Sequence, residues 1–122
     1  MKILAVGNDP ARLTQLCVCL AALFPDADVQ KETDALLAGK YAFNYRVDLL
    51  IAEVNTKRMN GIQLCRFVRR EQPDACTCLI GTEEEMLSVL PADDVDHMLE
   101  FPCTTASLRR ALLSRNGSAE TP

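Results

Sequence analysis

The stretch VDLLIAEVN, residues 47–55, contains an apolar run that ends in a single carboxylate, that of Glu53. A continuous apolar run without polar alternation is typical of a strand covered on both faces, as in parallel sheets. The stretch CTCLIG, residues 76–81, has the same character. The two runs predict neighbouring buried strands, and Glu53 then stands where one of them ends.

Around these runs the chain alternates short apolar segments with stretches of helical periodicity. Strands are predicted over residues 2–6, 27–31, 49–53, 76–81 and 95–99, and a helix is predicted after each of them. Alternation of strand and helix indicates an α/β fold with a doubly wound parallel sheet. In such sheets a functional site lies at the carboxyl ends of the strands, near the switch point.

Several residues are predicted to begin or end the helices. Asp9 is suited to cap a helix that begins at Pro10, and Thr33 is suited to cap the next one. The sequence TEEE from Thr82 to Glu85 has the spacing of a capping box, in which side chain and backbone bond reciprocally. These signals place the carboxyl ends of the strands directly before helix starts.

Composition limits the classes of function. The chain has 122 residues, of which 48% are hydrophobic, and a net charge of −4. That length fits one domain, predicted over residues 1–115, with a polar flexible tail or the start of a linker over 116–122. An acidic balance argues against broad nucleic-acid binding, and no apolar run approaches a membrane span, so we expect a cytoplasmic protein.

The six cysteines do not form a recognisable metal motif. Cys17 and Cys19 lie two apart on a predicted helix and point to different faces, so they cannot chelate one ion together. Cys76 and Cys78 share a strand face, but no second pair accompanies them. We expect small core side chains rather than metal ligands or disulfides.

Five positions at the predicted carboxyl edge carry a resemblance to a known family. From Met1 to about Leu113 the chain resembles the receiver domains of bacterial two-component response regulators, the CheY-like family. Asn8-Asp9 stands at the family's acidic pair, Glu53 at its phosphate-accepting Asp, and Met59-Asn60-Gly61 at its turn and glycine. Thr82 stands at its Ser or Thr, and Phe101-Pro102 at its Lys and cis-proline. The resemblance implies a flavodoxin-like (βα)5 fold with strand order 2-1-3-4-5.

The departures from the family pattern bear on function. Glu53 replaces the nucleophile and moves its carboxylate by about one bond, and about 1 Å of misplacement can cost a hundredfold in rate. Phe101 removes a cation that would stabilise developing negative charge. Asn8 removes one carboxylate from the pocket of Asn8, Asp9, Glu53 and Asn55, leaving at most weak Mg²⁺ binding and no other cofactor. We therefore expect no catalysis of phosphoryl transfer and no enzyme activity.

Two interpretations of Glu53 remain open. Its longer side chain could mimic part of a phosphoryl group's charge, with Lys57 or Arg58 from the following loop as the nearest cationic partners. Alternatively, it is a carboxylate left after the site decayed. For Phe101 the simpler interpretation is an apolar plug over the former pocket.

The family's two-state switch also has altered equivalents here. Thr82 is the switch hydroxyl or only a helix cap, and Met98 replaces the switch aromatic with a side chain that lacks distinct ring states. His97 beside it is expected to be structural.

The resemblance implies protein partners and a homodimer through the fourth helix, fifth strand and last helix. That surface carries charges of both signs, on Glu83, Glu84, Asp93, Asp94, Arg109 and Arg110. Arginines of the third helix are expected to be a solvated face.

Three hypotheses about function follow, in order of preference. The first is an atypical receiver that works without Asp phosphorylation, through protein contacts, and regulates a transcriptional output domain that binds DNA. The second is a Mg²⁺-dependent phosphoacceptor with a degenerate site. The third, a flavodoxin-like small-molecule binder, lacks a Gly-rich phosphate loop after the first strand.

Overall fold

A computed structural model describes residues 1–56, 58–89, 94–101 and 103–120, with side chains as far as residue 112. Within these residues five strands and five helices alternate along the chain. The strands are β1 (Lys2–Val6), β2 (Asp28–Glu32), β3 (Leu49–Glu53), β4 (Cys76–Gly81) and β5 (His97–Glu100). The helices are α1 (Pro10–Leu23), α2 (Ala35–Asn44), α3 (Gly61–Glu71), α4 (Glu83–Leu87) and α5 (Thr105–Glu120).

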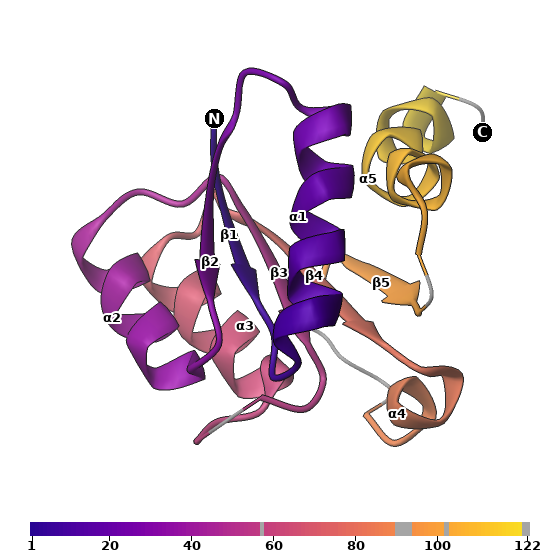
Figure 1. Cartoon of the computed structure of the whole chain (residues 1–122). Helices are drawn as coiled ribbons and strands as arrows, with labels where there is room; N and C mark the ends of the chain where they lie inside the picture. The colour runs from indigo at the N-terminus through magenta and orange to yellow at the C-terminus, as the bar shows by residue number, and fades with distance from the viewer. Residues whose placement is uncertain (57, 90–93, 102, 121–122) are drawn as a thin grey trace.

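All the strands are parallel and form one sheet in the order β2-β1-β3-β4-β5, as predicted. β3 lies in the centre and is buried along its whole length. Helices α1 and α5 cover one face of the sheet, and α2, α3 and α4 lie over the other (Figure 1). The doubly wound fold explains why β3 and β4 are apolar without alternation, because both of their faces are covered.

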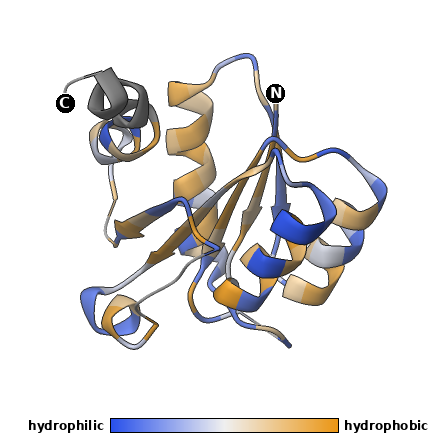
Figure 2. Cartoon of the chain, turned by 180° about the vertical axis from the view of Figure 1, so that it is seen from behind, coloured by the Kyte–Doolittle hydropathy of each residue, from blue (hydrophilic) through white to orange (hydrophobic). Residues whose placement is uncertain are grey.

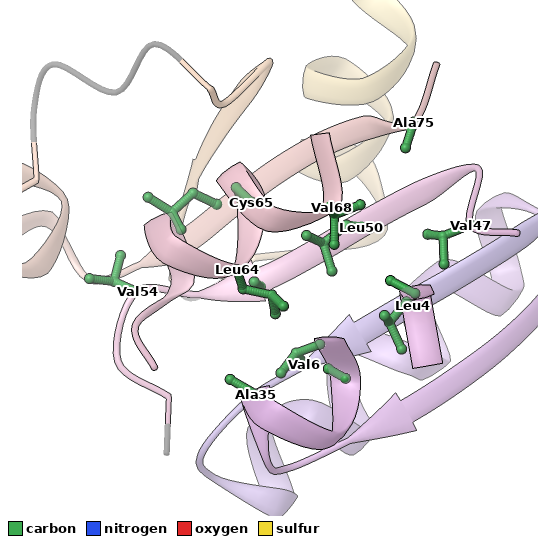
Figure 3. Close-up of a cluster of buried hydrophobic side chains, with 14 of the residues drawn as sticks. Leu4, Val6, Ala35, Val47, Leu50, Val54, Leu64, Cys65, Val68 and Ala75 are labelled. Carbon is green, nitrogen blue, oxygen red and sulfur yellow. The ribbon is translucent and has the colours of Figure 1, made fainter. Parts of the chain in front are cut away.

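Two apolar clusters hold the layers together. On the α2–α3 face, Leu4 and Leu50 from the sheet pack with Leu64 and Val68 from α3 (Figure 3). On the other face, Ile51 packs among residues of α1, such as Leu16 and Leu20. Alternate residues of one strand therefore stabilise opposite layers.

The cysteines follow the prediction of core side chains. All six are free thiols, and Cys19, Cys65, Cys78 and Cys103 are buried. Burial raises the pKa of the Cys65 thiol to about 12. A thiol held protonated in this way is a poor nucleophile and a poor metal ligand.

The helix starts agree with the sequence except in one case. Asp9 accepts a hydrogen bond from the Ala11 amide at 3.0 Å, so it caps α1 as predicted. The prediction that Thr33 caps α2 is wrong, because the Asp34 carboxylate accepts the Leu36 amide at 2.9 Å. An ionised carboxylate is the better acceptor beside the positive end of a helix.

Two boundaries near the C-terminus also differ from the prediction. β5 begins at His97, two residues later than predicted, because Asp96 instead binds Thr77: the Thr77 amide donates to the Asp96 carboxylate at 2.9 Å. Helix α5 continues to Glu120, through most of the segment where a flexible tail or the start of a linker was predicted. The domain end at 115 and the linker stay predictions.

Among the described residues, no helix has the length and apolar character needed to cross a membrane.

Candidate functional site at the carboxyl edge of the sheet

The strand register and one backbone hydrogen bond bring four chain segments to the same edge of the sheet. Val6 of β1 pairs with Ala52 of β3, which places Gly7 next to Glu53. On the other side, Glu53 pairs with Ile80 of β4. The amide of Phe101 donates to the carbonyl oxygen of Gly81 at 2.8 Å, which brings the end of β5 to this edge too.

Glu53 is buried rather than exposed at this edge. Only 5% of its surface is accessible, and its side chain lies against the backbone of Gly7. A Cβ atom at position 7 would overlap the Oε2 atom of Glu53. Gly7 therefore provides the space that the extra methylene of a Glu requires, a role that the sequence analysis missed.

The cation beside Glu53 comes from α1. The Nη1 atom of Arg12 lies 3.9 Å from Oε1 of Glu53. The guanidinium carbon of the same side chain lies 3.9 Å from the centroid of the Phe101 ring, a cation–π distance. Arg12 is thus sandwiched between an anion and an aromatic face. We refer to Glu53, Arg12 and Phe101 as the carboxylate–arginine–ring stack.

Electrostatics at Glu53 reflect its burial. Desolvation raises the pKa of the Glu53 carboxyl above its usual value, and Arg12 and the backbone amide of Asp9 act in the opposite direction. Glu53 Oε2 and Arg12 Nη2 are both buried without a hydrogen-bond partner in the described part of the chain. The ion pair therefore offsets only part of the cost of burying the charge.

In the predicted pocket of Asn8, Asp9, Glu53 and Asn55, the side chains of Asp9 and Asn55 have partners other than Glu53. Asn8 and Asp9 are exposed, and the Asp9 side chain is turned to cap α1. The Asn55 amide donates to a carboxylate oxygen of Glu85 at 2.6 Å, and the charge of Glu85 acts on Glu53. Helix capping therefore occupies the Asp9 carboxylate, and Glu85 occupies the Asn55 amide, whereas the backbone amide of Asp9 still bonds to Glu53.

These residues are a poor fit for Mg²⁺. The ion requires several oxygen ligands in octahedral geometry. Glu53 faces a guanidinium instead, and Asp9 is committed to the start of α1. Among the described residues, no three or more His, Cys, Asp or Glu side chains are arranged to hold a metal.

The expected partners of Glu53 lie elsewhere or outside the described residues. Arg58 pairs with Asp34 at 3.1 Å, so the prediction that it neutralises Glu53 is wrong. Lys57 and Pro102 lie outside the described residues. The sequence did contain a signal for Arg12, because a helix that begins at Pro10 directs its first turn toward the same edge as Glu53.

The remaining predicted positions have structural roles. Thr82 accepts the Glu85 amide at 3.2 Å, and the Glu85 carboxylate accepts the Thr82 amide at 2.8 Å, which confirms the capping box. Met98 is half-buried against the cluster on the α2–α3 face. Phe101 is half-buried at the edge of the other cluster, where it covers Arg12.

Comparison with solved structures identifies the fold. The receiver domain of a sensor histidine kinase from Pseudomonas aeruginosa, solved with magnesium in its active-site cleft, is 21% identical, with a TM-score of 0.78 over 93% of this chain and 94% of that one. A response regulator receiver domain protein from Clostridium thermocellum is 15% identical, with a TM-score of 0.79 over 98% and 96%.

A third match is the receiver domain of a signal transduction histidine kinase from Syntrophus aciditrophicus, which is 22% identical, with a TM-score of 0.76 over 98% of this chain and 92% of that one. No family model and no curated protein matches the sequence. Structural likeness at such low identity shows the fold alone. Together with the strand order and the register, it establishes that this chain has the CheY-like fold of response regulator receiver domains.

Proposed function

We propose that this chain is an atypical receiver domain of two-component signalling that acts through protein contacts, without Asp phosphorylation and without enzyme activity. The observation that carries the proposal is the carboxylate–arginine–ring stack. It occupies the place where the receiver resemblance puts the phosphate acceptor, and its Glu53 is 5% exposed.

The stack works against phosphoryl acceptance in two ways. A nucleophilic carboxylate must meet the phosphorus atom in line, and small misplacement is costly. Here the carboxylate is turned toward Gly7 and held on its other side by Arg12. At the end of β5, the ring of Phe101 binds the cation instead of presenting one to a phosphoryl group.

The same stack favours one conformation of the domain that does not change with phosphorylation. Glu53 supplies a carboxylate that needs no phosphodonor, and Arg12 compensates its charge within the chain, so the charge balance at this edge does not depend on phosphorylation. We propose that the domain presents one conformation to its partners, and that its signal depends on which partners are present.

Incubation with acetyl phosphate and Mg²⁺ tests this proposal. Intact-mass spectrometry is expected to show no added phosphoryl group, and beryllofluoride with Mg²⁺ is expected to leave the spectrum of the protein unchanged. The control is the variant Glu53→Asp combined with Phe101→Lys, which restores two of the family's groups. Stoichiometric labelling of the unaltered protein on Glu53 would contradict the proposal and favour the Mg²⁺-dependent phosphoacceptor.

We further propose a cytoplasmic homodimer that pairs through α4, β5 and α5, with a DNA-binding output domain encoded outside these residues. Glu83, Glu84, Arg109 and Arg110 are exposed and could pair across a two-fold axis. Asp94 instead pairs with Arg66 of the same chain at 3.1 Å, and Asp93 lies outside the described residues. Sedimentation equilibrium tests this, since a strict monomer would contradict the dimer.

A further inference from the structure

Helix α2 has an unusual distribution of apolar side chains. Its inward face consists of small residues, with Ala35, Ala38 and Ala42 buried in the core. Its large apolar side chains point outward, and Leu36 is 39% exposed and Phe43 is 67% exposed. Large apolar side chains normally take the buried positions. The outer face of α2 therefore carries apolar surface that the core does not use.

Helices α2 and α3 lie side by side (Figure 1). The outward side chains of α2 border a hollow that residues of both helices line. The hollow has a volume of about 190 Å³, enough for one or two apolar side chains. It is lined by Leu36, Gly39, Lys40, Phe43, Asn44, Met59 and Phe67. Leu36, Lys40 and Phe43 follow each other at i, i+4 and i+7, so they form one stripe along the helix. Hydrophobic turns of α2 alongside α3 can be followed in Figure 2.

Gly39 forms part of this hollow without being required by the fold. A Cβ atom at this position would lie 3.7 Å from the Phe67 ring and 4.0 Å from Leu64, which are ordinary contacts. Glycine inside a helix is less stable than alanine. The chain thus keeps a less stable residue where a side chain would fit, and the effect is a deeper hollow. Proteins often keep a residue that lowers folding stability where that residue serves binding.

The charge around the hollow is positive. Lys40 lines it, and the guanidinium carbon of Arg70 lies 5.9 Å from the centroid of the Phe67 ring. No carboxylate is among the described lining residues. The lining therefore holds a cation and no carboxylate, although the whole chain carries a net charge of −4. Complementary charge would favour an acidic partner.

We propose that the hollow between α2 and α3 is a docking site for an amphipathic helix of a partner protein, with an acidic flank. A groove between two helices is a common receptor for a helix that inserts apolar side chains at i, i+3 or i+4, and i+7. The apolar face of the partner enters beside Phe43 and Phe67, and its carboxylates face Lys40 and Arg70. This site is separate from Glu53 and does not depend on whether that residue is phosphorylated.

A peptide titration tests the proposal. The probe is a synthetic amphipathic helical peptide with Leu and Phe on one face and Glu on the flank, compared with the same peptide carrying Lys in place of Glu. Chemical-shift changes in the ¹⁵N-labelled protein are expected on α2 and α3 for the acidic peptide, with weaker binding at higher salt. Reversal of two cations in Lys40→Glu with Arg70→Glu is expected to weaken binding about tenfold.

Variants of the hollow complete the test. Phe43→Ala is expected to weaken binding about tenfold or more, because a buried aromatic anchor dominates such interfaces. Leu87→Ala is the matched control, since Leu87 is 66% exposed on α4 and its loss should leave binding unchanged. Gly39→Ala is expected to weaken binding while raising the melting temperature, which separates a filled hollow from a damaged fold.

Four outcomes would overturn the proposal. The first is an absence of shifts on α2 and α3 with the acidic peptide. The second is equal binding of the acidic and the basic peptide. The third is an equal effect of Phe43→Ala and Leu87→Ala. The fourth is self-association of the protein that Phe43→Ala abolishes, because it would make a second copy of this chain the occupant.

Discussion

Two regions of this molecule depart in opposite directions from the usual placement of side chains. At the carboxyl edge of the sheet, the charge of Glu53 is buried. On the outer face of α2, apolar Phe43 is exposed. Burying a charge is costly unless it is paired, and exposing a large apolar group forgoes stabilisation. The first departure closes a site from within by means of Arg12. The second leaves a surface open to a partner.

Glycines mark both regions, and substituting them should have opposite effects. Gly61 follows the Asn60 cap of α3 next to β3, and a Cβ atom there would overlap the backbone oxygen of Glu53. Backbone cannot rotate away, so we expect Gly61→Ala to destabilise the protein by about 3 kcal/mol. Urea unfolding measures the change. A loss below about 0.5 kcal/mol would show that the edge of the sheet is adaptable and that the close packing of Glu53 is not required.

Breaking the ion pair between Arg12 and Glu53 should cause the next largest loss of folding stability. Arg12→Met keeps much of the apolar stem but leaves Glu53 buried without its cation, and we expect a loss of about 1–2 kcal/mol. That value lies below the range for fully buried pairs because a third of the Arg12 side chain is exposed. Adding Glu53→Gln should recover part of the loss in a double-mutant cycle.

The matched control is Arg66→Met, which breaks a shorter ion pair with Asp94 at 3.1 Å on the surface. Because 62% of the Arg66 side chain is exposed, we expect a change below about 0.5 kcal/mol. If Arg66→Met lowers the free energy of unfolding as much as Arg12→Met does, burial does not explain the difference expected between the two ion pairs.

The pH dependence of folding stability should differ between Glu53, at the end of β3, and Asp48, just before its start. Burial raises the folded-state pKa of Glu53, so the folded state binds its proton more tightly than the unfolded chain. Stability should therefore fall as pH rises through the interval above the usual value of 4.5. Glu53→Gln should remove that fall in unfolding curves recorded across this interval, and an unchanged pH profile would contradict it.

Asp48, directly before β3, should behave in the opposite way. The Lys2 amide donates to its carboxylate at 2.7 Å and Arg46 adds a second bond, so the pKa of Asp48 is lowered from 3.8. The stability that these bonds provide should be lost as pH falls below that value. Asp48→Asn should reduce this acid sensitivity without affecting the interval in which Glu53 titrates.

The smallest effect is expected on α2. Gly39→Ala should stabilise the protein by about 0.5–1 kcal/mol, because alanine restricts the unfolded chain and its Cβ meets only ordinary contacts. Thermal unfolding measures the gain. A destabilised variant would mean that the glycine is required for packing against Phe67, and the interpretation of α2 as a helix that forgoes stability would fail.

Much of the fold could be predicted from local patterns. The continuous apolar runs of β3 and β4, the cap at Asp9 and the capping box at Thr82 were read from residues close together in sequence. The assignment of α2's cap to Thr33 failed because two adjacent polar residues compete for the same amides, and local pattern does not rank them. The late start of β5 was missed because it depends on Thr77, a residue of another strand.

The candidate site was predicted only in part for the same reason. Sequence alone placed Glu53 at the end of a buried strand and showed that a cation was absent from position 101. It offered Lys57 and Arg58 as the candidate cations, because nearness in the chain was the only measure available. The tertiary structure pairs Arg58 with Asp34 and brings Arg12 to Glu53.

What the sequence by itself determined is the order of strands and helices and the buried centre of the sheet. These follow from periodicity and residue type, which act over a few neighbouring positions. The differences from the receiver pattern came from the resemblance to that family. Only the tertiary structure decided that Gly7 makes room for Glu53, that Arg12 is held against Phe101, and that α2 leaves a hollow beside α3. Those features depend on contacts between segments that become neighbours only when the parallel strands are in register.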